Sequence, residues 1–230
     1  MAIGIIGAMD EEIELLKSEM TIDKTIEAAG SVFIKGVLCN QTVVLLKSGI
    51  GKVNAAIATT ILHERFTIDR VINTGSAGGF AKELEVGDVV ISTLVTHHDV
   101  DVTAFQYEYG QVPGLPALYP ADSVLMEKAM EAVESTNAKA KKGIIATGDS
   151  FMQEEARVNF VRGKFPEMIA AEMEAAAIAQ VCYKYTTPFV VIRALSDIAG
   201  KESSISFDQF LPKAATNAAT MIMTMLSSID

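Results

Sequence analysis

Two carboxylates stand at the edges of apolar segments in the C-terminal part of the chain. Glu174 lies in AEMEAAAIA (171–179), and Asp197 lies in VVIRALSDIAG (190–200). Burying an ionised carboxylate costs free energy unless the group is paired or hydrogen-bonded. These two residues are therefore candidates either for ion pairs or for acid–base chemistry.

The segment PFVVIRAL (188–195) predicts a buried strand, because it is β-branched and apolar apart from Arg193. Ser196 and Asp197 then fall where the strand gives way to a loop. Ligand sites of α/β enzymes lie at such strand ends, although Ser196 or Asp197 could also do no more than cap a turn. The strand by itself leaves both interpretations open.

Composition limits the class of protein. With 230 residues, of which 50% are hydrophobic, the chain can form one domain (1–230) with a sizeable core. The net charge of -10 argues against a nucleic-acid partner, since such binding depends on Lys and Arg side chains that neutralise phosphates. Small-molecule ligands remain the natural partners.

Cysteine usage and hydropathy bear on the compartment. Cys39 and Cys182 lie in apolar contexts without metal-ligand spacing, which favours a reducing environment. No basic residue precedes Lys17, so we expect no signal peptide. No apolar run approaches the roughly 18 residues that a membrane helix needs, so we expect no membrane association. Together these features predict a cytoplasmic protein.

β-Branched runs alternate with Ala-rich runs along the chain, the pattern of an α/β fold with a largely buried sheet. We expect strands over 3–8, 87–98, 143–147 and 188–195, a strand that runs into a glycine-rich loop within 70–80, and a hairpin over 32–49 that turns near 39–41. We expect helices over 9–20, 53–66, 123–135, 153–163, 171–182 and 208–228. The segment 100–122 is rich in aromatic residues, Pro and Gly, and loops of this length are usually functional.

Three glycine-bearing turns follow predicted strands, at 5–9, 47–55 and 73–80. Glycine lets backbone N–H groups approach a ligand closely, although each turn could equally be plain strand-to-helix punctuation. None of the three matches the dinucleotide fingerprint G-x-G-x-x-G or the phosphate-binding P-loop. We therefore expect no cofactor.

Many short motifs occur together in one order: GIIGAMDEEIELL, SGIGKVNAA, NTGSAGG, GDVV, DVTAFQYEYGQVPG, TGDSF, AEMEAAAIA and RALSDIAG. With these motifs nearly the whole chain resembles the 5′-methylthioadenosine/S-adenosylhomocysteine nucleosidases, a family of the purine nucleoside phosphorylase fold group. The resemblance implies a single α/β domain with a central twisted mixed sheet flanked by helices, assembled as a homodimer. It also implies hydrolysis of the bond between adenine and a 5′-thioribose, in methionine salvage and the recycling of adenosylmethionine by-products.

An N-glycosidic bond breaks through an oxocarbenium-like sugar, so a catalyst must stabilise the departing base, deliver water and hold the ribose. The resemblance implies that Asp197 is the general acid at the five-membered ring of adenine. That role requires Asp197 to hold a proton near neutral pH, as a buried strand end would favour. Glu12 would activate the attacking water, and Glu174 would accept hydrogen bonds from the ribose 2′ and 3′ hydroxyls.

Helical spacing separates these carboxylates from their acidic neighbours. Asp10, Glu11 and Glu12 cannot share one face of a helix, so only one of them needs to be catalytic. An acidic helix start that only complements the helix dipole is the alternative for all three. Glu172 and Glu174 are two residues apart and would diverge on a helix, so Glu172 is expected to be solvated or capping.

The resemblance also assigns the remaining pocket, which would bind adenine thionucleosides. Purine and ribose would be contacted by Ser76, Ala77, Gly78, Phe151, Met152, Met173 and Ser196. The thioether end would be lined by Met9, Ile50 and Phe207. Arg193 would be buried and paired, either orienting Glu174 or serving the structure alone. On the long loop, Val102, Phe105 and Pro113 would reach the site of the other subunit.

No metal site is expected, because the adjacent His97 and His98 would point to opposite faces of a strand. Three alternative functions stay open: a phosphorolytic nucleoside phosphorylase, a hydrolase of futalosine-type or other adenine nucleosides, and a nucleoside sensor without turnover. The chain has no arginine before Arg65, and a glutamate after the first strand repels phosphate and suits water. The three matching carboxylates argue against a sensor.

Overall fold

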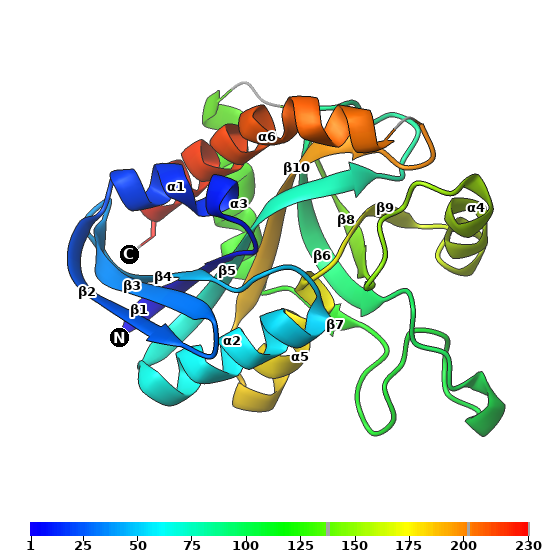
Figure 1. Cartoon of the computed structure of the whole chain (residues 1–230), viewed down its shortest axis with the longest axis horizontal. Coiled ribbons are helices and arrows are strands. Elements are labelled where there is room, and N and C mark those ends of the chain that lie inside the picture. The colour runs from blue at the N-terminus through cyan, green and yellow to red at the C-terminus, as the bar shows by residue number, and fades with distance from the viewer. Residues whose placement is uncertain (137–138, 202, 230) are drawn as a thin grey trace.

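The structure is a computed structural model that describes residues 1–136, 139–201 and 203–229. It has the predicted α/β fold, a mixed sheet with helices on both faces (Figure 1). The strands are β1 (Ala2–Gly7), β2 (Thr21–Ala28), β3 (Ser31–Leu38), β4 (Gln41–Lys47), β5 (Ile68–Gly79), β6 (Val89–His97), β7 (Tyr119–Pro120), β8 (Ala140–Thr147), β9 (Met168–Glu172) and β10 (Phe189–Ile198). The helices are α1 (Asp10–Ser18), α2 (Lys52–Arg65), α3 (Ser123–Thr136), α4 (Glu155–Lys164), α5 (Ala175–Tyr185) and α6 (Ser203–Leu226).

The strands follow the order β10-β6-β8-β9-β5-β1-β4-β3-β2, and β7 pairs with β6. Strand β10 also pairs with β5, so β5, β10, β6, β8 and β9 close into a ring. β1, β5 and β10 are parallel to one another and mostly buried, which explains the nearly continuous apolar sequences of β1 and β10. The β2–β3–β4 hairpins extend the sheet on the far side of β1.

Two helical layers cover the sheet. On one face α1, α3 and α6 pack together, and Ile13, Leu16, Leu125 and Ile222 belong to one apolar core there. On the other face α2 and α5 pack against each other through small side chains such as Ala55, Ala58 and Ala179. Figure 1 shows these layers above and below the strands, with α4 beside β8 and β9. Burial of both faces leaves the strand ends as the places where polar side chains can gather.

The carboxyl ends of several strands meet at one place. Strand β9 overlaps only the last residues of β5, where Gly78 pairs with Ala171 and Gly79 with Ala170. Because these two strands are antiparallel and overlap only at their carboxyl ends, Glu172 arrives beside the end of β5. The parallel β10 brings Asp197 opposite Gly78. Residues far apart in the sequence are thereby collected around one point.

The structure differs from the prediction at three elements. The helix expected from 171 is wrong at its start, because Met168–Glu172 form β9 and α5 begins at Ala175. The NTGSAGG segment was expected to become a loop, but β5 continues through Gly79. The strand β2 was missed because its sequence TIDKTIEA is mostly exposed at the sheet edge and carries no buried stripe.

The long segment 100–122 contains one short 3-10 turn at Thr103–Phe105 and the two-residue strand β7, and its first part extends away from the body of the molecule (Figure 1). Among the residues that the structure describes, no helix is both long and apolar enough to cross a membrane.

Candidate active site

A cavity of about 360 Å³ lies where these strand ends meet. Every site residue predicted within the chain itself contributes to its wall: Met9, Glu12, Ile50, Ser76, Ala77, Gly78, Phe151, Met152, Met173, Glu174, Arg193, Ser196, Asp197 and Phe207. The wall also includes residues that were not predicted: Ala8, Ser150, Ala171, Glu172 and Asp208. The volume is within the range of small-molecule sites.

Glu12 lies in the first turn of α1 and is only 2% exposed. Its Oε2 accepts hydrogen bonds from the backbone N–H groups of Ala8 (2.7 Å) and Met9 (3.2 Å) and so caps the helix. Its Oε1 accepts the N–H (2.9 Å) and the hydroxyl (3.1 Å) of Ser76 on β5. The helix-capping residue and the candidate base are therefore the same residue, and capping holds its carboxylate at the wall of the cavity.

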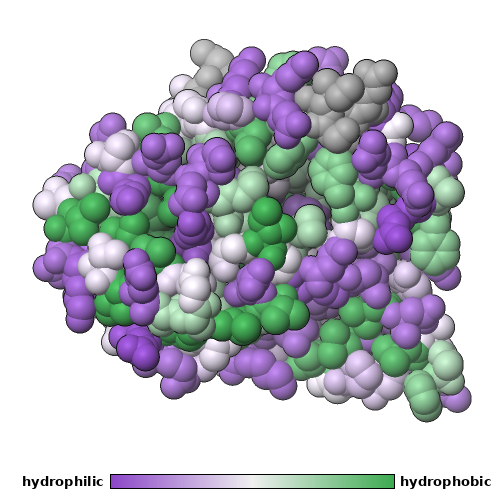
Figure 2. Space-filling view, in the orientation of Figure 1, coloured by the Kyte–Doolittle hydropathy of each residue, from purple (hydrophilic) through white to green (hydrophobic). Residues whose placement is uncertain are grey.

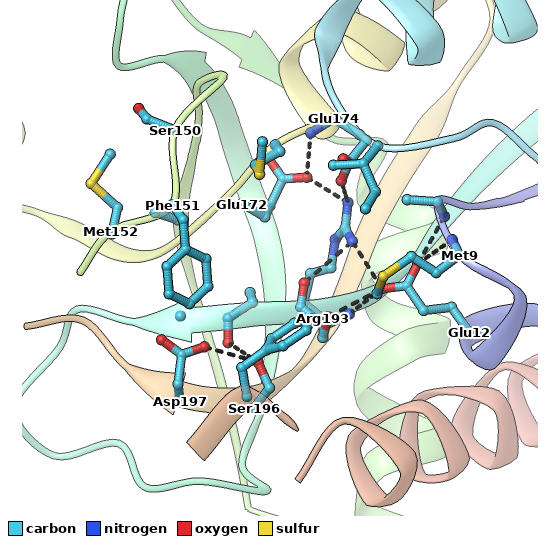
Figure 3. A pocket seen from close by; sticks show the side chains of 18 of the residues that line it. Met9, Glu12, Ser150, Phe151, Met152, Glu172, Glu174, Arg193, Ser196 and Asp197 are labelled. Carbon is cyan, nitrogen blue, oxygen red and sulfur yellow. Dashed lines mark hydrogen bonds and ion pairs between the residues drawn. The ribbon is translucent and has the colours of Figure 1, made fainter. Parts of the chain in front are cut away.

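Arg193, in the middle of β10, stands among three carboxylates (Figure 3). Its Nη2 donates to Glu172 Oε2 at 2.5 Å and to Glu174 Oε2 at 3.4 Å. Its Nη1 lies 4.0 Å from Glu12 Oε1. Burial opposes the charge of the guanidinium, but the three carboxylates raise its pKa. Arg193 is thus buried and paired as expected, and it pairs with Glu172 more closely than with Glu174.

Gly75 makes room for this charged group. Its φ of +144° is a conformation that residues with side chains rarely adopt. A Cβ atom there would collide with the Arg193 guanidinium and lie 2.5 Å from Glu12 Oε1. The glycine that suggested close approach of a ligand instead lets two side chains of the protein itself pack against β5.

Glu172 was expected to be solvated or capping, and only the capping is confirmed. Its Oε2 accepts the N–H groups of Glu174 (3.0 Å) and Ala175 (2.8 Å) at the start of α5, while its other oxygen accepts the Thr147 hydroxyl. The residue is 8% exposed, so it is not solvated. The helical-spacing argument failed here because Glu172 ends a strand and Glu174 is the N-cap residue, so neither lies on a helix.

Glu174 is buried, and its Oε1 accepts the N–H of Gly51 at 2.8 Å. Burial, followed by the charge of Glu172, raises the pKa of Glu174 to about 7, although Arg193 and the Gly51 N–H act in the opposite direction. Glu174 therefore changes its charge near neutral pH in the ligand-free protein.

A β-bulge places Ser196 and Asp197 together in the cavity. Leu195 pairs with Ala77 and Asp197 pairs with the very next residue, Gly78, so Ser196 is the extra residue in β10. Neighbouring residues of a regular strand face opposite sides, but here both line the same cavity. The Ser196 hydroxyl donates to Asp197 Oδ1 at 2.9 Å, and Asp197 is 3% exposed.

Aromatic and sulfur-containing side chains complete the cavity. The ring of Phe151 lies 5.9 Å from that of Phe207 in an edge-to-face contact. Phe151 is 42% exposed, which is high for an aromatic side chain beside a cavity, whereas Met152 is buried. Figure 3 shows Phe151 close to Asp197, with Glu12 and Glu174 on the other side of the view. The cavity therefore has an apolar side next to Asp197 and a charged side around Arg193.

The predicted residues of the long loop lie elsewhere. Val102, Phe105 and Pro113 do not line the cavity of their own chain, and Phe105 is 74% exposed. Their predicted contribution to the site of a partner subunit stays a prediction.

The adjacent His97 and His98, at the carboxyl end of β6, contact different parts of the structure. His97 Nε2 is 3.2 Å from Gln180 Oε1, whereas the His98 ring packs against Gly148. Burial is the main cause that lowers the pKa of both histidines. In the described part of the chain, no group of three or more His, Cys, Asp and Glu side chains has an arrangement that could hold a metal ion.

Comparisons with known proteins show which family the chain belongs to. The family model of the Phosphorylase superfamily matches residues 2–227. A 5′-methylthioadenosine/S-adenosylhomocysteine nucleosidase of Oceanobacillus iheyensis is 62% identical over 229 residues, with 100% of both chains covered. The crystal structure of such a nucleosidase from Neisseria meningitidis, in complex with methylthio-immucillin-A, has a TM-score of 0.97 at 49% identity and covers 99% of each chain.

A solved structure with a different activity in its name is also similar. Futalosine hydrolase of Helicobacter pylori has a TM-score of 0.94 at 34% identity, with 99% of this chain and 98% of that chain covered. Its lower identity sets it further from this chain than the two nucleosidases. The chain belongs to the phosphorylase superfamily and, within it, to the 5′-methylthioadenosine/S-adenosylhomocysteine nucleosidase family.

Proposed function

We propose that this protein hydrolyses the N-glycosidic bond of 5′-methylthioadenosine and S-adenosylhomocysteine, releasing adenine and the 5′-substituted ribose. The observation that carries the proposal is the placement of three buried carboxylates, Glu12, Glu174 and Asp197, around one cavity. The bond between base and sugar would lie between Asp197 and Glu12, which stand on opposite sides of the site (Figure 3). The products serve methionine salvage and the recycling of adenosylmethionine by-products.

Each carboxylate has a separate step in this reaction. Asp197 gives its proton to the five-membered ring of adenine as the bond from C1′ to the base breaks, so the base leaves neutral. Water attacks C1′ from the opposite face, and Glu12 takes its proton. Glu174 accepts hydrogen bonds from the ribose hydroxyls and holds the sugar in place. Ser196 donates to Asp197 Oδ1 and so orients the acid.

The charge of the site favours water over phosphate as the nucleophile. Glu12, Glu172 and Glu174 surround the single guanidinium of Arg193. A phosphate dianion next to these carboxylates would meet repulsion in a poorly solvated site, whereas a neutral water molecule would not. This arrangement supports hydrolysis and argues against phosphorolysis.

Adenine release without phosphate is the direct test of the proposed function. The protein is expected to release adenine and a reducing 5′-thioribose from methylthioadenosine and adenosylhomocysteine in phosphate-free buffer, as followed by chromatography. Strict dependence on phosphate, with a ribose 1-phosphate product, would contradict the hydrolytic mechanism. Futalosine should be tested beside both substrates, because one of the similar structures is named a futalosine hydrolase. A clear preference for futalosine would replace the proposed substrate class.

Nucleosides with free 2′ and 3′ hydroxyls are expected to bind more tightly as the pH rises through about 7. The hydroxyls donate hydrogen bonds to ionised Glu174, whereas burial, followed by Glu172, raises the pKa of free Glu174 to about 7. Below that pH a proton must leave on binding, so the dissociation constant grows by up to about tenfold per pH unit. Calorimetry with a non-hydrolysable methylthioadenosine analogue measures this slope.

Two controls accompany the pH measurement. The 2′,3′-dideoxy analogue should lack the slope, because it gives Glu174 no donor. Glu174→Ala should lose both the slope and the preference for the ribo over the 2′-deoxy nucleoside. If Glu174→Ala keeps that preference, the ribose hydroxyls contact another group.

We further propose that the protein is a homodimer whose interface includes α2 and the long loop. Apolar side chains just before and on the first turns of α2 are exposed, with Ile50 at 50%, Val53 at 68% and Ile57 at 43%. Figure 2 shows apolar atoms gathered over α2 and over the loop at the lower right. Exposed apolar surface of this kind indicates an interface.

The free thiols of Cys39 and Cys182 support a cytoplasmic location for the protein, because disulfides are rare in that reducing compartment.

The dimer would bring Val102, Phe105 and Pro113 to the cavity of the partner subunit. Small-angle scattering of dilute, active protein is expected to give twice the mass of one chain, with a symmetric interface. Phe105→Ala should weaken both association and activity, because the ring is 74% exposed in the single chain and would be buried in the dimer. A fully active monomer would remove these three residues from the site.

A further inference from the structure

The first turn of α2 has no cap from its own sequence, because its N-cap residue is Gly51, which has no side chain. Two carboxylates from distant segments take that place. Glu174 Oε1 accepts the Gly51 N–H and Asp149 Oδ1 accepts the Lys52 N–H, both at 2.8 Å. Acceptors at a helix start satisfy its free N–H groups and complement its dipole. The start of α2 thereby connects Glu174 to Asp149.

Asp149 is itself held by a closed set of contacts. Its N–H donates to Asp99 Oδ2 at 3.0 Å, and Lys52 Nζ donates to Asp99 Oδ1 at 2.5 Å. Burial acts to raise the pKa of Asp99, but the hydrogen bonds from Lys52 and from the Asp149 N–H lower it overall. The Asp99–Lys52–Asp149 triangle therefore ties together three segments that follow β6, β4 and β8.

The contact between Asp149 and the start of α2 leaves little room for a side chain at Gly51. Gly51 has a φ of +95°, and a Cβ atom on it would lie 3.0 Å from Asp149 Oδ1. This backbone conformation turns two successive N–H groups toward two different carboxylates. Asp149 does not line the cavity itself, although the next two residues, Ser150 and Phe151, do. Its side chain reaches the carboxylates of the site through the Lys52 N–H, the start of α2 and Glu174.

We propose that Asp149 is a positioning residue for ribose recognition. By holding the Lys52 N–H, it keeps the Gly51 N–H on Glu174 Oε1 and so sets the orientation in which Glu174 meets the ribose hydroxyls. Asp99 and Lys52 hold Asp149 in turn. The role of Asp149 rests on the proposed function insofar as Glu174 is the group that binds the ribose.

Two substitutions at Asp149 separate positioning from general damage. Asp149→Ala removes the acceptor and is expected to raise KM for methylthioadenosine about tenfold, with kcat changed by less than about twofold, as for loss of a hydrogen bond to a charged group. Asp149→Asn keeps an oxygen acceptor and should restore most of the affinity. The matched control is Glu154→Ala, an exposed acid nearby that makes no side-chain capping bond, and it should behave as wild type.

A double-mutant cycle tests the route through Glu174. In a Glu174→Ala background, which leaves the Gly51 N–H no side chain to orient, Asp149→Ala should change KM by less than about twofold, because coupled residues are not additive. The full tenfold effect in that background would overturn the proposal, as would a fall in kcat with KM unchanged.

A readout without substrate separates this proposal from the proposed function. Hydrogen exchange at the Gly51 and Lys52 amides should become faster in Asp149→Ala and stay close to wild type in Asp149→Asn. Unchanged exchange in Asp149→Ala would overturn the positioning role. Failure of the wild-type protein to release adenine would instead overturn the proposed function and leave the exchange result standing.

Discussion

Asp197→Asn is expected to lower the turnover of methylthioadenosine by about a hundredfold or more, the usual range for loss of a general acid. Asparagine keeps the shape of the side chain and can still accept the Ser196 hydroxyl at the position of Oδ1, which lies 2.9 Å away. The asparagine amide has no ionisable proton to give to the leaving base. Steady-state assays of adenine release measure the loss.

A substrate with an activated leaving group distinguishes proton donation from structural damage. The nitrophenolate of a nitrophenyl riboside leaves without being protonated. The Asp197→Asn variant should therefore cleave this substrate at close to the wild-type rate. Misfolding would abolish both reactions equally. An equal loss on both substrates, or little loss on either, would remove Asp197 from the role of acid.

Glu12→Gln is expected to keep nucleoside binding and to lose at least about a hundredfold in turnover, as for removal of a general base. The geometry adds a second effect on folding. Both carboxylate oxygens accept backbone N–H groups, from Ala8 and Met9 on one side and from Ser76 on the other. A glutamine amide must turn its NH2 group toward one of these donors. The free energy of unfolding should therefore fall by about 1–3 kcal/mol.

Asp10→Asn is the matched control for Glu12→Gln. Asp10 lies in the same first turn of α1, but it is exposed and pairs with Lys47 at 2.8 Å on the surface. Its substitution should leave turnover unchanged and stability within about 1 kcal/mol of wild type. Near-normal activity of Glu12→Gln, measured beside this control, would transfer the role of base to another residue.

The sequence predicted best where local pattern and burial agree. The run VVIRAL is apolar and β-branched, and it forms the buried strand β10 with Arg193 inside it. The acidic segment after the first strand forms α1, with Glu12 in the first turn. In both places the amino-acid pattern of a single segment is enough to indicate the element, because a continuous β-branched apolar run favours a buried strand and an acidic segment with one apolar face favours a helix.

The prediction failed where the pattern was ambiguous. The Ala-rich stretch from Met168 to Tyr185 contains both β9 and α5, and alanine favours a helix over its whole length. The strand forms because residues 168–172 are fully buried between β8 and β5, which no local property records. The burial of Glu172 and its ion pair with Arg193 were missed with it.

Taken alone, the sequence determined the fold class, the approximate positions of most strands and helices, and the carboxylates that deserve testing. How those groups interact depends on the folded structure. Pairing of β5 with both β1 and β10 brings Glu12, which follows β1, and Asp197 to one cavity, and the extra residue Ser196 in β10 turns Asp197 into it. Burial, followed by the charge of Glu172, raises the pKa of Glu174 to about 7. These properties depend on pairing register and on neighbours distant in the chain, and a residue's own sequence context contains neither.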